Sequence, residues 1–97
     1  MYANAYETVA ASQTDQVLGP NGGAGNILSR LIIVPATTGA GTVSIKDGGG
    51  SAINVFVAGT LADLSPIVIQ LDAVSTAGAW KVTTGANVSV IAIGKFI

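Results

Sequence analysis

Apolar and polar residues alternate along most of the chain with a period of two, which is typical of half-buried β-strands. Residues 42–46 are a clear case, with Val43 and Ile45 set between polar neighbours. No segment shows the period of 3.6 residues that indicates a helix. About eight short strands follow one another at roughly ten-residue spacing, separated by Gly, Pro, Asn or Ser. The expected strands lie within residues 7–12, 16–18, 27–35, 42–46, 51–57, 67–71, 79–83 and 87–92.

This pattern predicts an all-β fold, a single-domain antiparallel β-sandwich or jelly roll. The 97 residues fit one domain, and no linker or tandem repeat divides them. Residues 1–6 form a short segment of mostly small residues with two tyrosines, and we expect them to form a flexible N-terminal arm. Residues 7–97 would then form the sandwich domain.

Residues 79–95 carry the most regular pattern in the chain. Trp80 and Val82 alternate with small or polar neighbours, a Gly and Asn turn follows at 84–87, and alternation resumes through Val90. This pattern predicts a β-hairpin. We expect the lone tryptophan to cover one end of a small core, because its ring is large. In residues 51–57, alternation would turn Ile53, Val55 and Val57 to one face.

The scarcity of charge points to a protein that is covered by partners. Charged residues make up 9% of the chain and apolar residues 49%, whereas about 25% charged residues is usual. We therefore expect copies of the chain or a larger assembly to cover much of its surface. Aliphatic side chains of residues 31–34 and 91–93 either belong to the core or form an exposed patch for assembly. The candidate interface residues are Tyr2, Tyr6, Ile32, Val34, Ile91 and Ile93.

Residue chemistry excludes several kinds of active site. The chain has no histidine and no cysteine, so Ser-His-Asp and Cys-His catalysis and the usual zinc sites are impossible. Its five acids are spread singly, and nothing indicates the carboxylate pair of a glycosidase. We therefore expect a non-enzymatic protein without catalytic residues, metal or cofactor.

Nucleic-acid and membrane partners are also not expected. The four basic residues are scattered singly along a chain of net charge −1, whereas phosphate binding needs clustered Lys and Arg. No apolar stretch approaches the roughly 18 residues of a membrane-spanning helix. The glycine-rich residues 19–25 lack the lysine and helix of a phosphate loop. Asp47 with residues 48–50 fits a hairpin turn better than a calcium site, because only one acid is local.

Three segments carry a resemblance to a known group of proteins. They are residues 31–35 (LIIVP), 43–48 (VSIKDG) and above all 78–90 (GAWKVTTGANVSV). These segments resemble small β-rich virion proteins of tailed bacteriophages, nearest to the head decoration or cement type. The resemblance spans residues 16–96, and it supplies no functional residue.

The resemblance implies a capsid decoration protein of the phage head. Such a protein is a structural, non-enzymatic component of the virion, assembled as a homotrimer and bound to the major capsid protein. The alternative is a receptor- or carbohydrate-binding β-module of a phage tail or head fibre. Modules of that kind usually present aromatic platforms, and Trp80 is the residue whose substitution would test this alternative.

Overall fold

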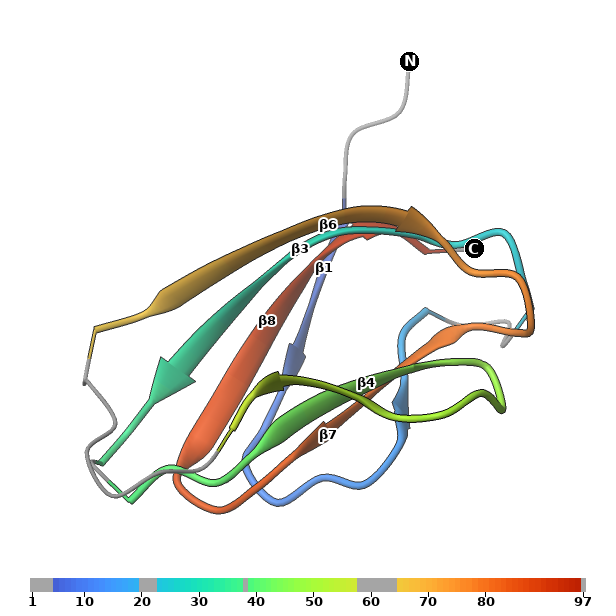
Figure 1. Cartoon of the computed structure of the whole chain (residues 1–97). Helices are drawn as coiled ribbons and strands as arrows, with labels where there is room; N and C mark the ends of the chain where they lie inside the picture. The colour runs from blue at the N-terminus through green and yellow to red at the C-terminus, as the bar shows by residue number, and fades with distance from the viewer. Residues whose placement is uncertain (1–4, 20–22, 38, 58–64, 97) are drawn as a thin grey trace.

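A computed structural model describes residues 5–19, 23–37, 39–57 and 65–96. These residues form two antiparallel four-stranded sheets packed face to face, a β-sandwich as the sequence predicts (Figure 1). None of the described residues is helical. The strands are β1 (Ala5–Val9), β2 (Gln16–Val17), β3 (Ile27–Pro35), β4 (Val43–Asp47), β5 (Ile53–Phe56), β6 (Ile67–Val74), β7 (Trp80–Thr84) and β8 (Val88–Lys95).

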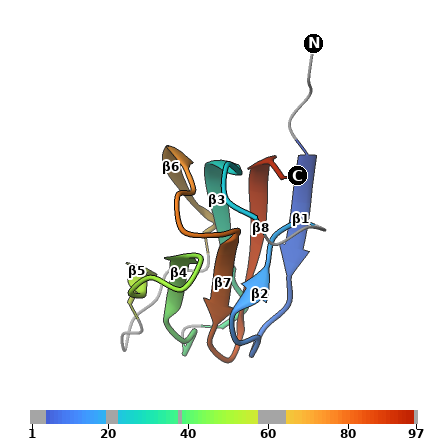
Figure 2. The ribbon, with the colours of Figure 1, turned by 90° about the vertical axis from the view of Figure 1, so that its right-hand side faces the viewer.

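The order of strands gives the sandwich two distinct edges. Sheet A has the order β1-β8-β3-β6 and sheet B the order β2-β7-β4-β5. As a result β1 and β2 lie at one edge, and β6 and β5 lie at the opposite edge (Figure 2). Each sheet covers the core with one face only, and this arrangement explains the regular alternation of the sequence.

The core between the sheets consists of inward aliphatic side chains. Leu31 and Ile33 of β3, Val82 of β7 and Val90 of β8 are fully buried. Trp80 is only 5% exposed, which places its ring inside the protein as expected. Among the described residues, every buried side-chain nitrogen and oxygen has a hydrogen-bond partner. The core is therefore apolar, and its few polar groups are satisfied.

The predicted hairpin at residues 79–95 is wrong, because β7 and β8 belong to different sheets. β7 pairs with β2 and β4, whereas β8 pairs with β1 and β3. The turn between them crosses from one sheet to the other, where Gly85 lies so close to Gly41 that a Cβ on Gly85 would come within 2.7 Å of the Gly41 Cα. Both a hairpin and this crossover turn every second side chain to the core. Alternation alone could not tell them apart.

The predicted faces of β5 are only partly right. A register shift in the pairing of β4 with β5 disturbs the simple alternation. Val55 and Phe56 both pack against the core, whereas Ile53 is 53% and Val57 68% exposed. The hairpin that joins β4 to β5 is confirmed.

Strand β1 begins within the expected N-terminal arm. Ala5 and Tyr6 pair with Gly94 and Ile93 of β8, because that long strand offers main-chain partners beyond residue 7. Tyr2 and the rest of the expected arm lie outside the described residues.

Candidate interaction surface on the outer face of sheet A

Sheet A turns a set of aliphatic side chains away from the core. Ile32 and Val34 of β3 and Ile91 and Ile93 of β8 alternate with buried residues, and all four are half-buried on the outer side. Ile32 lies directly opposite Ile91 in the ladder. The structure therefore brings these four sequence candidates together on the outside of the sandwich, which decides against their being core residues.

Two rows of paired residues cross this outer face from one edge to the other. Side chains opposite each other on one face of a sheet are close enough to interact. Tyr6 at one edge is 72% exposed, and Val68 at the other is 60% exposed. The first row is Thr8, Ile91, Ile32 and Val68, and the second is Tyr6, Ile93, Arg30 and Gln70. We define the apolar face as Tyr6, Arg30, Ile32, Val34, Val68, Ile91 and Ile93.

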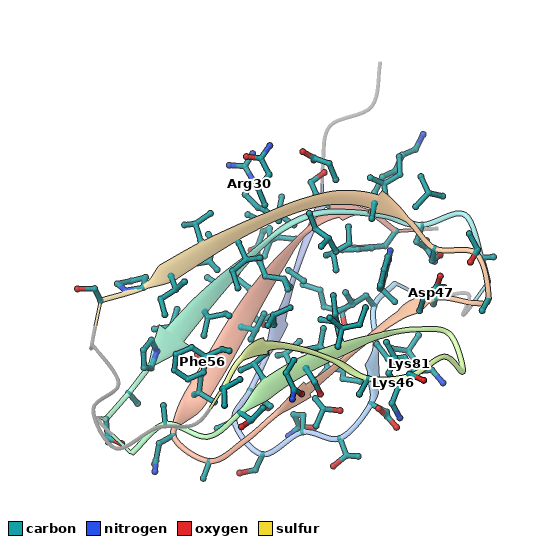
Figure 3. The ribbon with its side chains drawn as sticks, in the orientation of Figure 1. Arg30, Lys46, Asp47, Phe56 and Lys81 are labelled. Carbon is teal, nitrogen blue, oxygen red and sulfur yellow. The ribbon has the colours of Figure 1, made fainter. Side chains whose placement is uncertain are left out.

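Arg30 is the cation within the apolar face, a position that the sequence pattern did not predict. It follows a β-bulge, because the register shifts between Leu28 and Arg30 against both neighbouring strands. Figure 3 shows its side chain projecting outward from sheet A. The side chain is exposed, and no carboxylate among the described residues forms an ion pair with it. The guanidinium is therefore available for an acceptor on a partner.

The outer face of sheet B is mostly polar, with Val17 of β2 as an exposed apolar side chain at its edge. Lys46 of β4 and Lys81 of β7 lie opposite each other and are labelled side by side in Figure 3. Lys46 Nζ lies 3.2 Å from Asp15 Oδ2. This bond is the main cause of the lowered pKa of Asp15, and the Thr83 hydroxyl lowers that pKa further. Other outward residues of β4 and β7, such as Ser44, are small and polar.

Asp47 is used inside the chain. Its carboxylate accepts hydrogen bonds from the main-chain nitrogens of Ala77 and Thr76, at 3.0 and 2.9 Å, and from the Thr76 hydroxyl at 2.9 Å. These bonds favour the charged form, so the pKa of Asp47 is lowered, with Ala77 the largest contributor. The side chain therefore ties the β4–β5 hairpin to the turn between β6 and β7.

The described part of the chain contains no concave pocket. It also holds no group of three or more His, Cys, Asp or Glu residues that could bind a metal ion. None of its segments is a helix long and apolar enough to cross a membrane. The surface that remains for a functional proposal is a flat one.

Comparisons with protein-family models, curated proteins and solved structures each gave no match. The feature of the structure that bears on function is therefore the contrast between the apolar outer face of sheet A and the polar outer face of sheet B. Aromatic residues and arginine are enriched in protein interfaces, and the apolar face holds one of each, Tyr6 and Arg30.

Proposed function

We propose that this chain is a non-enzymatic structural protein that docks onto a larger assembly through the apolar face of sheet A. The observation that carries the proposal is the row of aliphatic side chains across that sheet, set against the polar outer face of sheet B. An exposed apolar face of this kind is the usual mark of an interaction site.

The size of the face suits a docking surface. Four strands of five to nine residues, spaced about 4.8 Å apart, cover roughly 500 Å². A partner that covered this area would bury about 1,000 Å² in total, which is near the lower limit for a specific interface. Arg30 would then be desolvated, so the partner should offer it a carboxylate or carbonyl oxygen.

The resemblance to phage virion proteins suggests what the larger assembly is. We propose that the chain is a decoration or cement protein of a phage head. It would bind the major capsid protein with sheet A and stand beside its own copies, and sheet B would face the solvent. Apolar burial contributes roughly 25 cal/mol per Å², so a modest contact repeated over a shell stabilises it greatly.

Co-sedimentation with purified capsid shells of the corresponding phage tests this proposal. Ile91→Lys places a charge at the centre of the apolar face and should abolish binding. Ser44→Lys adds the same charge to the outer face of sheet B and should leave binding unchanged. Circular dichroism of both variants checks that they are folded. Equal binding by the two variants would show that the apolar face is not the docking surface.

The carbohydrate-binding alternative lacks a comparable observation. Its expected platform, Trp80, is 5% exposed, and Tyr6 is the one exposed aromatic side chain among the described residues. Phe56 and Phe96 are half-buried against the core. A single tyrosine on a flat apolar sheet suits protein contact better than sugar stacking.

A further inference from the structure

The two edges of the sandwich close the core to different degrees. At the β1/β2 edge, Val9 and Leu18 are fully buried. Glu7 also links the two layers there, since its carboxylate accepts hydrogen bonds from Gln16 Nε2 at 2.9 Å and from Gly19 N at 3.0 Å. At the β5/β6 edge, the inward apolar side chains stay only partly buried. They are Val55, Phe56, Ile67, Ile69, Leu71 and Ala73.

Exposed hydrophobic side chains gather at this same β5/β6 edge. Of the six exposed large hydrophobic residues among those described, four lie on β5, on β6 or directly after β5. These are Ile53 at 53%, Val57 at 68%, Val68 at 60% and Val74 at 54% exposure. The edge is therefore apolar both toward the core and toward the outside.

Residues 67–71 of β6 carry neither a charge nor a proline that would guard the edge against pairing. Proteins usually protect a sheet edge with charged residues, proline or bulges. β5 carries no charge, although a bulge shifts its register against β4. β6 carries only Asp72, which has a positive φ of 51° and lies at the bulge that follows residue 70. Among the described residues, β6 pairs only with β3 and β5 only with β4. Residues 67–71 thus offer a regular, uncharged stretch of open strand edge.

We propose that a second copy of this chain pairs with this edge, β6 against β6, to form a two-fold symmetric dimer. A partner must offer two strand edges stacked about 10 Å apart, as the sheets of a sandwich are. A copy of the same edge has that spacing by construction. With the two-fold axis along the sheet normal, β6 meets the partner's β6 antiparallel while β5 meets the partner's β5.

The sequence of β6 suits pairing with itself. Centred on Ile69, an antiparallel pair sets Ile67 against the partner's Leu71 on the core side and Val68 against the partner's Gln70 on the outer side. The two copies of Asp72 then lie at opposite ends of the pair, so like charges do not face each other.

The area of this edge suits a small, weak dimer. The paired residues 67–71 span about 17 Å, and the smallest extent of the chain is 18 Å. Their product is roughly 300 Å² for each copy, or about 600 Å² in total, which is the size of a weak interface, and main-chain hydrogen bonds between the paired edges add to it. Pairing would also join the two apolar faces into one eight-stranded surface on the same side of the dimer. The dimer does not depend on what that surface binds.

Sedimentation velocity over a range of protein concentrations tests the dimer. The 9.6 kDa chain should sediment as a species of twice that mass. Val68→Lys should raise the dimer dissociation constant about tenfold or more, because it adds charges at the paired edge. Thr8→Lys is the matched control, since residue 8 ends the same row of the apolar face at the opposite edge; it should leave the dimer intact. Ile53→Lys on β5 should weaken the dimer without touching sheet A.

Crosslinking tests the register, because the chain has no cysteine of its own. Val68→Cys and Gln70→Cys proteins, mixed and oxidised, should form a disulfide-linked dimer. Neither should do so alone, because equal positions lie about 8 Å apart, beyond the roughly 7 Å reach of a disulfide. The dimer departs from the homotrimer that the resemblance implies, so a trimer in solution would overturn the proposal, as would a monomer. A dimer joined through the outer face of sheet A would overturn it as well. Such a dimer would be disrupted by Thr8→Lys or Ile91→Lys, and it would survive Ile53→Lys and Val68→Lys.

Discussion

The indole Nε1 of Trp80 donates a hydrogen bond to the main-chain oxygen of Asn26 at 3.2 Å. The same oxygen accepts a second bond from Ser75 N at 2.8 Å, and Asn26 N donates to the Ser75 hydroxyl at 3.1 Å. Trp80 lies in sheet B, whereas Asn26 and Ser75 flank strands β3 and β6 of sheet A. This buried cluster fixes the two sheets to each other at one end of the sandwich.

Two substitutions of Trp80 separate the packing of its ring from its hydrogen bond. Trp80→Ala should reduce the free energy of unfolding by about 3–5 kcal/mol, because it leaves a large cavity. Trp80→Phe should cost only about 1–2 kcal/mol, since Ser75 still donates to the Asn26 oxygen. Urea denaturation followed by circular dichroism measures both. Equal losses for the two variants would mean that the hydrogen bond, and not the ring volume, dominates.

The role of Asp47 predicts an acid-sensitive contact. Its pKa is lowered from the ordinary value of 3.8 by hydrogen bonds from Ala77 and Thr76. A carboxylate with a lowered folded pKa stabilises the protein above its unfolded pKa, and that contribution is lost as pH falls through the folded value. The urea midpoint of the wild type should therefore fall more steeply below about pH 4 than that of Asp47→Asn.

Asp15 provides the comparison for this pH dependence. Lys46 lowers the pKa of Asp15 as well. Asp15→Asn should therefore also reduce the fall of the urea midpoint at low pH. The Asp15 effect should weaken in high salt, because that ion pair is partly exposed. The Asp47 effect should persist in salt, since its donors are uncharged main-chain and hydroxyl groups. If the urea midpoint of Asp47→Asn falls as steeply at low pH as that of the wild type, this account is wrong.

Gly94 marks a close approach between β8 and β3. A Cβ at this position would collide with the main-chain oxygen of Ile27, and that oxygen belongs to a ladder that cannot move freely. Gly94→Ala should therefore destabilise the protein by about 1–3 kcal/mol. Gly49→Ala is the matched control, because nothing lies within 4 Å of its Cβ position, and it should change stability by less than about 0.5 kcal/mol. Thermal denaturation of both variants measures the difference.

The alternation of side chains predicted the class of fold and much of the core, because period-two patterning depends on one strand at a time. Which strands pair depends on the path of the chain between them, and so the crossover between β7 and β8 looked like a hairpin. The register that sets Lys46 opposite Lys81 joins residues far apart in the sequence, which had seemed to be isolated charges. Bulges have no simple sequence signature, so the packing of both Val55 and Phe56 against the core and the position of Arg30 were not predicted.

Four of the candidate interface residues could be named from the sequence because they come from only two strands, β3 and β8. In both strands the face opposite to the buried one also carries aliphatic side chains. These are Ile32 and Val34 in one strand and Ile91 and Ile93 in the other. A strand with only one buried face would not need them. The sequence could not show that β3 and β8 are neighbours and form one patch. It also could not show that the inward residues of β6 remain half-buried at an edge.

Arg30 should be the most sensitive polar residue of the apolar face if that face docks onto a shell. Arg30→Gln should weaken co-sedimentation with capsid shells roughly tenfold or more, because a desolvated arginine at the centre of an interface contributes strongly. Binding of the Arg30→Gln variant to the shells should also depend less on salt than binding of the wild type. Lys81→Gln removes the same charge from the outer face of sheet B and should leave binding unchanged. If Lys81→Gln weakens binding and Arg30→Gln does not, the sandwich docks with its opposite side.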